Sequence, residues 1–131
     1  MLRGEGRATM QKNILVVDDD HHCRDGLRDS LVGAGYCVET AASSWEAIKK
    51  VKEHLFEVAI IDLDLSPVVG AAMNGWELVR IFRTLHPAIA VILVGAEEDN
   101  QVRARAAQLE VSEFLEKPIS PARLKMIVGT L

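Results

Sequence analysis

Short strand-like runs in this sequence are followed directly by charged residues. These are residues 14–17 before Asp18, Asp19 and Asp20, residues 58–61 before Asp62, and residues 113–116 before Lys117. Carboxylates that lie close together repel one another and raise one another's pKa values, so a cluster of them needs a cation. Oxygen ligands in this number suit Mg²⁺, which takes one or two carboxylates and keeps several waters. The sequence therefore predicts a magnesium site, provided that the ends of these runs meet in the fold.

The runs have the character of parallel strands separated by helices. Residues 14–17, 58–61 and 89–94 are apolar on both faces, as buried strands are, and residues 36–40 and 113–116 are weaker candidates. The helical patterns lie at residues 27–34, at a segment capped by Ser44, at residues 76–85 capped by Asn74, at 97–109 and at 120–131. This alternation predicts an α/β fold, a doubly wound five-stranded parallel sheet with helices on both faces. Ligands bind such sheets beyond the carboxyl ends of the strands, where the charged residues stand.

Length and composition limit the remaining classes of protein. A chain of 131 residues and 14.4 kDa suits one domain, which we expect over residues 12–131 after a flexible tail at residues 1–11. The hydrophobic fraction of 49% argues against a disordered chain, and the longest apolar stretch, residues 88–96, is far shorter than the roughly 20 residues of a membrane span. The net charge of −4 argues against a general nucleic-acid surface. Two cysteines without metal-ligand spacing favour a reducing cytoplasm.

Taken together, the motifs resemble the receiver domain of two-component response regulators. The residues that carry the resemblance are Ile14-Leu15-Val16-Val17-Asp18-Asp19, Asp62 with Leu63, Leu65 and Pro67, Asn74-Gly75, and Lys117-Pro118. Each motif alone is weak, but their order and their placement at strand ends are specific. The resemblance covers residues 12–131 and implies a flavodoxin-like (βα)5 fold.

The resemblance also implies a role for each charged residue. Asp62 would be the phosphoacceptor for a sensor histidine kinase or a histidine phosphotransfer protein. Mg²⁺ would be held by Asp18, Asp19, Asp62 and the backbone carbonyl of Asp64, and Lys117 would bridge to a phosphoryl oxygen. The chain would not be an enzyme in the ordinary sense, because it would catalyse only its own phosphorylation and hydrolysis.

Two segments depart from the pattern of the family. The family usually has Thr or Ser at the end of the fourth strand, where this chain has Gly95 followed by Ala96. The partner switch position, usually aromatic, is Phe114, which is either a switch residue or a plain core residue. The segment from Leu65 to Met73 is longer and more apolar than the resemblance predicts, and is either a tolerated surface insertion or a partner-contact loop.

These departures leave alternatives open. The leading hypothesis is a phospho-accepting signalling switch. The main alternative is an interaction module of receiver fold whose phosphorylation-dependent output is weakened or lost. A metal-dependent phosphatase is a more distant reading, since Asp64 stands two residues after Asp62. No DNA-binding segment follows Leu131, so we expect the output to come from a separate partner protein or a missing domain. The last two helices could form a dimer, and no direct contact with nucleic acid or membrane is expected.

Overall fold

A computed structural model describes residues 12–65 and 74–131 of the chain. The expected tail at residues 1–11 and most of the Leu65–Met73 segment lie outside the described residues. The strands are β1 (Asn13–Val17), β2 (Cys37–Ala41), β3 (Val58–Asp62), β4 (Ala90–Gly95) and β5 (Glu113–Glu116). The helices are α2 (His21–Gly33), α3 (Ser44–Glu53), α4 (Gly75–Leu85), α5 (Asn100–Gln108) and α6 (Pro121–Thr130). Within the described ranges, no helix combines the length and the apolar character needed to cross a bilayer.

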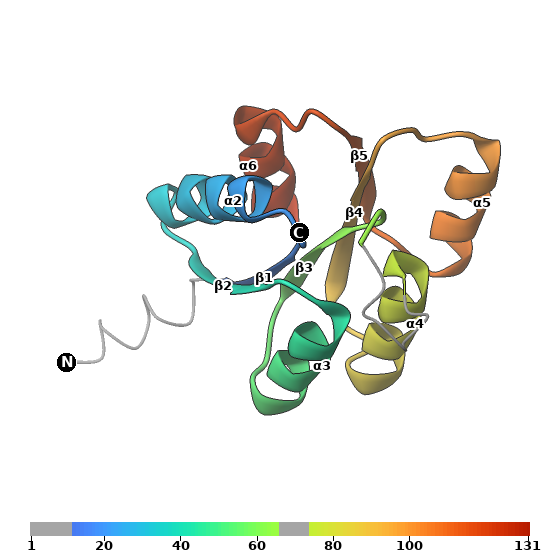
Figure 1. Ribbon diagram of the computed structural model, residues 1–131, viewed down its shortest axis with the longest axis horizontal. Coiled ribbons are helices and arrows are strands. Elements are labelled where there is room, and N and C mark those ends of the chain that lie inside the picture. Colours follow the sequence, from blue (N-terminus) through green and yellow to red (C-terminus); the bar gives the residue numbers. More distant parts are fainter. Residues whose placement is uncertain (1–11, 66–73) are drawn as a thin grey trace.

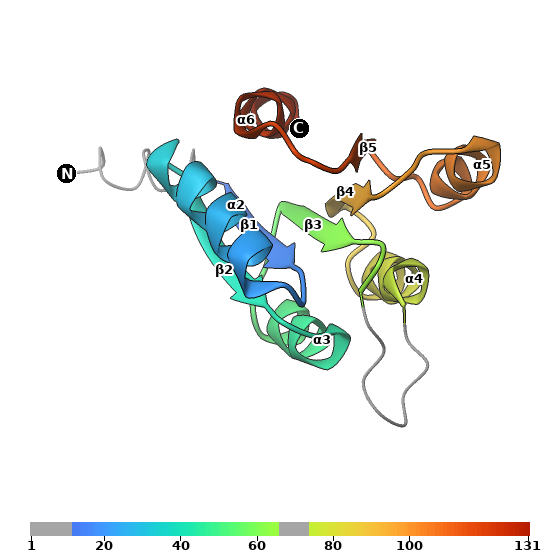
Figure 2. The same ribbon diagram turned by 45° about the horizontal axis from the view of Figure 1, so that its top comes forward.

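All the strands run parallel in one sheet, in the order β2-β1-β3-β4-β5. Figure 1 and Figure 2 show α2 and α6 over one face of this sheet, and α3, α4 and α5 over the other. Alternate residues of each strand enter two separate cores. In β1, for example, Leu15 and Val17 pack toward α3 and α4, whereas Ile14 and Val16 pack toward α2 and α6. The predicted doubly wound parallel sheet is therefore confirmed.

Capping side chains set the helix starts, and several of these starts differ from the expectation. α2 begins at His21, before the apolar pattern at residues 27–34, because the Asp20 carboxylate accepts from the His22 N–H. The cap of α3 is Ser43, whose hydroxyl accepts a hydrogen bond from the Glu46 N–H, so the expectation of Ser44 was wrong by one residue. The helix expected over residues 97–109 begins only at Asn100, because the Asp99 carboxylate accepts from the Val102 N–H at 2.8 Å. A serine pair and an acidic run each offer several capping side chains, and the sequence pattern does not choose among them.

The order of the strands brings the predicted residues to one place. β1 and β3 are neighbours, and their register pairs Val17 with Ile61. Asp18, which follows β1, and Asp62, which ends β3, therefore stand side by side at the carboxyl edge of the sheet. This is also the point at which the connections diverge to opposite sides of the sheet, and sheets of this kind have their binding crevice at such a switch point.

Candidate phosphoacceptor site

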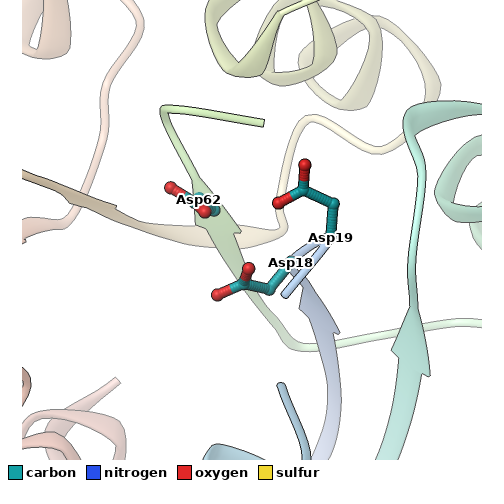
Figure 3. A group of neighbouring side chains, drawn as sticks. All are labelled: Asp18, Asp19 and Asp62. Atoms are coloured by element: carbon teal, nitrogen blue, oxygen red, sulfur yellow. The ribbon is translucent and has the colours of Figure 1, made fainter. Parts of the chain in front are cut away.

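Three carboxylates gather between the ends of β1 and β3 (Figure 3). Asp18 and Asp62 are buried, with 2% and 4% of their surface exposed, whereas Asp19 is exposed. One oxygen from each of the three lies within 4.8 Å of the others. The close approach predicted from the strand ends is thus present, and these oxygens are near enough to bind one cation together.

Both oxygens of Asp62 are held by hydrogen-bond donors. The Asp64 N–H donates to Oδ1 at 2.9 Å, and the Lys117 ammonium donates to Oδ2 at 3.1 Å. Lys117 thus reaches Asp62 from the end of β5, across the end of β4. The Asp64 side chain itself is exposed.

Burial shifts the ionisation of the two partners unequally. Burial raises the pKa of Asp62, and the charge of Asp18 raises it further, against the lowering effects of the Asp64 N–H and of Lys117. Burial alone would lower the pKa of Lys117, but its hydrogen bond to Asp62 and the charges of Asp62 and Asp18 raise that pKa overall. Lys117 keeps a third of its side chain exposed, so water still solvates its charge. The free-energy cost of burying a charge therefore falls mainly on the Asp62 carboxylate.

Asp18 has neighbours that the sequence reasoning did not single out. The Asp20 N–H donates to the Asp18 Oδ1 at 2.9 Å, and the Asp20 carboxylate caps α2 through the His22 N–H. The Arg24 guanidinium, one turn into α2, donates to the backbone carbonyl of Asp18 at 3.0 Å. An aspartate just before a helical run is a recognisable cap, but no sequence signal assigns Arg24 to this carbonyl. The two contacts anchor the Asp18 backbone to the start of α2.

Cys23 lies beside the carboxylates but is not activated by them. Burial raises the pKa of its thiol to about 12, aided by a hydrogen bond with Asp18 and by the charge of Asp18. A thiol with so high a pKa stays protonated at neutral pH and is a poor nucleophile. The charge of Lys117 lowers the pKa of this thiol, but burial and Asp18 outweigh it.

The residues at the two expected switch positions lie together, although neither touches the Asp62 carboxylate through a hydrogen bond that the structure records. Gly95 ends β4, and the following Ala96 is exposed. Phe114 is 7% exposed and belongs to the core under α3, α4 and α5. The Phe114 ring fills the space that a side chain at position 95 would occupy, because a Cβ at Gly95 would lie 2.9 Å from the Cζ of Phe114.

Replacing Asp62 with asparagine should stabilise the metal-free domain at neutral pH. The native pKa of Asp62 is raised above its ordinary value of 3.8, so the folded state holds this proton more tightly than the unfolded chain does. The stability that Asp62 contributes is therefore present below that ordinary value and is lost as the pH rises through the native pKa. Urea denaturation in EDTA should show the advantage of Asp62→Asn growing across this window. The exposed Asp64 serves as control, and an Asp62→Asn advantage no larger than that of Asp64→Asn would contradict the expected ionisation cost.

The comparisons with known proteins agree with this geometry. The sequence profile described as "Response regulator receiver domain" matches residues 14–129. The "Uncharacterized 14.6 kDa protein in sodA1 3'region" of Leptolyngbya boryana is 34% identical over 123 residues, which cover 90% of this chain and 88% of that protein. The transcriptional regulatory protein ZraR of Klebsiella oxytoca is 32% identical over 120 residues, or 91% of this chain. The chain spans only about a quarter of the length of ZraR, 26%.

The solved structures include a CheY-like response regulator receiver domain protein from Methanospirillum hungatei JF-1. It superimposes with a TM-score of 0.83 at 28% identity, over 92% of each chain. The profile match covers most of the chain and includes the strand ends that carry Asp18, Asp62 and Lys117. The chain therefore belongs to the response regulator receiver domain family.

Proposed function

We propose that this domain is the phospho-accepting switch of a cytoplasmic two-component phosphorelay, with Asp62 as the acceptor. The observation that carries the proposal is the setting of Asp62, a buried carboxylate whose two oxygens are held by the Asp64 N–H and by Lys117. A carboxylate is a competent nucleophile, and phosphoryl transfer depends mainly on positioning and on neutralising charge. Family membership supports the same assignment.

The transfer would take place between Asp62 and a phosphohistidine of a sensor kinase or a histidine phosphotransfer protein. A carboxylate oxygen of Asp62 would form a bond to phosphorus while the bond from phosphorus to the histidine nitrogen breaks, leaving its electron pair on the imidazole. Lys117, which already donates to Asp62, is placed to donate to an oxygen of the incoming group. The domain would also promote the later hydrolysis of its own acyl phosphate, and in this limited sense alone would it act as an enzyme.

The carboxylates fit the magnesium ion that the family generally uses. Asp18, Asp19 and Asp62 each offer an oxygen within 4.8 Å of the others, and we assign the backbone carbonyl of Asp64 as a further ligand by resemblance. When bound, Mg²⁺ neutralises the negative charge that a phosphoryl group brings to three carboxylates. Lys117 is the ammonium that the structure places against Asp62, and a single positive charge does not balance such a group.

Acetyl phosphate, a small-molecule donor, tests the proposal without the partner kinase. Intact-protein mass spectrometry should show the addition of one phosphoryl group when Mg²⁺ is present and none in EDTA. Asp62→Asn should remain unmodified, while Asp64→Asn should be modified as the wild type is. Modification of Asp62→Asn to the wild-type extent would remove the assignment of the acceptor.

Asp19→Asn should weaken Mg²⁺ binding while leaving the fold intact. The Asp19 carboxylate is the exposed member of the cluster, so its replacement removes a candidate ligand without disturbing the core. We expect the Kd for Mg²⁺ to rise on the order of tenfold or more. Titration calorimetry would measure the Kd, with Asp29→Asn on the exposed surface of α2 as control. Equal affinities for the wild type and Asp19→Asn would exclude a metal role for this residue.

The output of the domain is a separate proposal. Transcriptional regulators such as ZraR are among the relatives, so an output domain or a downstream protein is a natural recipient of the signal. One observation favours the alternative of a weakened phosphorylation-dependent output, namely the absence of a hydroxyl at Gly95. A phosphoryl group can shift a conformational equilibrium only through contacts that differ between the two states, and Gly95 has no side chain to make one.

A further inference from the structure

Gly95 is a glycine for reasons of space and not of backbone conformation. Its φ angle lies outside the left-handed region, so the backbone at this position would accept any residue. A Cβ built there would nevertheless lie 2.9 Å from the Phe114 Cζ and 3.5 Å from the Cβ of Leu63. The first distance is shorter than two carbon atoms allow without movement. The missing side chain thus leaves a space beside Leu63 that the tip of the Phe114 ring occupies.

The strand that carries Phe114 is fixed beside this notch. β4 and β5 pair in register, with Leu93 opposite Phe114 and Gly95 opposite Glu116. The Lys117 N–H donates to the Gly95 carbonyl at 2.9 Å and extends this pairing beyond the strand ends. The ring is 7% exposed and packs within the core under α3, α4 and α5. Backbone pairing and burial together hold the ring in this position.

The loop between β4 and α5 is tied to the same strand. The Glu116 carboxylate accepts from the Glu98 N–H at 2.9 Å, and the Glu98 carboxylate pairs with Arg103 at 3.6 Å. These contacts join β5, the loop and α5, and none of them involves Asp62. The loop is therefore held in the unmodified domain by contacts made outside the acceptor site.

We propose that Phe114 and Gly95 form a fixed packing pair, which holds the face made by α5, β5 and α6 in one conformation. Phe114 therefore does not change position when Asp62 is modified. The second half of this proposal rests on the proposed function of Asp62. The first half concerns packing alone and is tested without phosphorylation. A side chain at position 95, even a methyl group, would have to displace the ring. The hollow of about 240 Å³ that Phe114 lines with Glu98, Glu116 and Arg123 is the adjacent space that a displaced ring could enter.

A double-mutant cycle tests the packing pair. Gly95→Ala should lower the Tm by about 5 °C or more, because its methyl group overlaps the ring tip. Leucine has no atom at the position of Cζ, so in the Phe114→Leu background the same change should leave the Tm equal or higher, since alanine loses less chain entropy than glycine. If Gly95→Ala does not fold, folding of the double variant would support the pair. An equal cost in both backgrounds, or no cost in either, would overturn it.

A spectroscopic measurement tests the second half. The chain has three phenylalanines, Phe56, Phe82 and Phe114, so the ring signals can be assigned by single substitutions to leucine. When beryllofluoride and Mg²⁺ are added, the Asp64 amide signal should move while the Phe114 ring signals move no more than those of Phe56. A larger movement of the Phe114 signals would overturn the proposal that the ring keeps its position. An unmoved Asp64 amide would count against the proposed function of Asp62, and the double-mutant cycle would then decide the packing pair by itself.

Discussion

Replacing Gly75 with alanine should destabilise the domain by about 3 kcal/mol and disturb the acceptor loop. Gly75 begins α4, directly after its cap Asn74, and lies against the residues that follow β3. A Cβ at Gly75 would lie 2.8 Å from the Leu63 Cα and 2.9 Å from the Asp62 carbonyl oxygen. Both are backbone atoms, which cannot rotate away as the end of a side chain can. The added methyl group must therefore move either α4 or the chain segment that carries the acceptor.

Gly26 provides a matched control for this substitution. It lies within α2, and a Cβ there would meet no heavy atom within 4 Å. Gly26→Ala should therefore stabilise the domain by roughly 0.5–1 kcal/mol, because alanine is the better helix former. Urea denaturation of both variants would give the two free energies of unfolding. If the free energy of unfolding changed by the same sign and size in the two variants, the close approach of Gly75 to Asp62 would contribute nothing to stability.

Lys117→Ala should slow the phosphorylation of Asp62 by acetyl phosphate about 10- to 100-fold. The substitution removes one hydrogen bond to a charged group, which is worth roughly 1.5–3 kcal/mol. The ammonium donates to the Asp62 Oδ2 and also lowers the pKa of Asp62, so its removal would take away the proposed donor to a phosphoryl oxygen and leave the carboxylate harder to ionise. Both effects slow the phosphorylation.

The time course of mass incorporation at saturating Mg²⁺ would measure this rate. Lys125→Ala is the matched control, because Lys125 lies on the exposed side of α6 and the substitution removes the same side chain. Its rate should remain within twofold of the wild type. A Lys117→Ala rate equally close to the wild type would show that the ammonium does not assist the transfer.

The sequence predicted where the charged residues meet because its strands end at the site. Residues 14–17 and 58–61 are apolar on both faces, and such runs are buried strands in a parallel sheet. The residues that follow the strands then meet at one edge of the sheet, whatever the exact bounds of the strands are. This is why Asp18, Asp62 and Lys117 could be placed together before any distance was known.

Contacts that depend on side-chain packing could not be predicted in the same way. The sequence gives no sign that the Phe114 ring fills the space beside Gly95. The two residues lie on different strands and meet only through the register of β4 and β5. The Arg24 contact with the Asp18 carbonyl depends likewise on how α2 lies against β1. The start of α3 was wrong for a different reason, because Ser43 and Ser44 are chemically equivalent caps and the sequence pattern does not distinguish between them.

The most direct test of the central claim is to identify the modified residue chemically. The wild-type domain would be treated with acetyl phosphate and Mg²⁺, reduced with borohydride, which converts a phosphorylated aspartate to homoserine, and digested for peptide mass spectrometry. We predict homoserine at position 62 alone, absent in EDTA and absent without acetyl phosphate. Homoserine at Asp18, Asp19 or Asp64 with Asp62 intact, or conversion at Asp62 that persists in EDTA, would contradict the account.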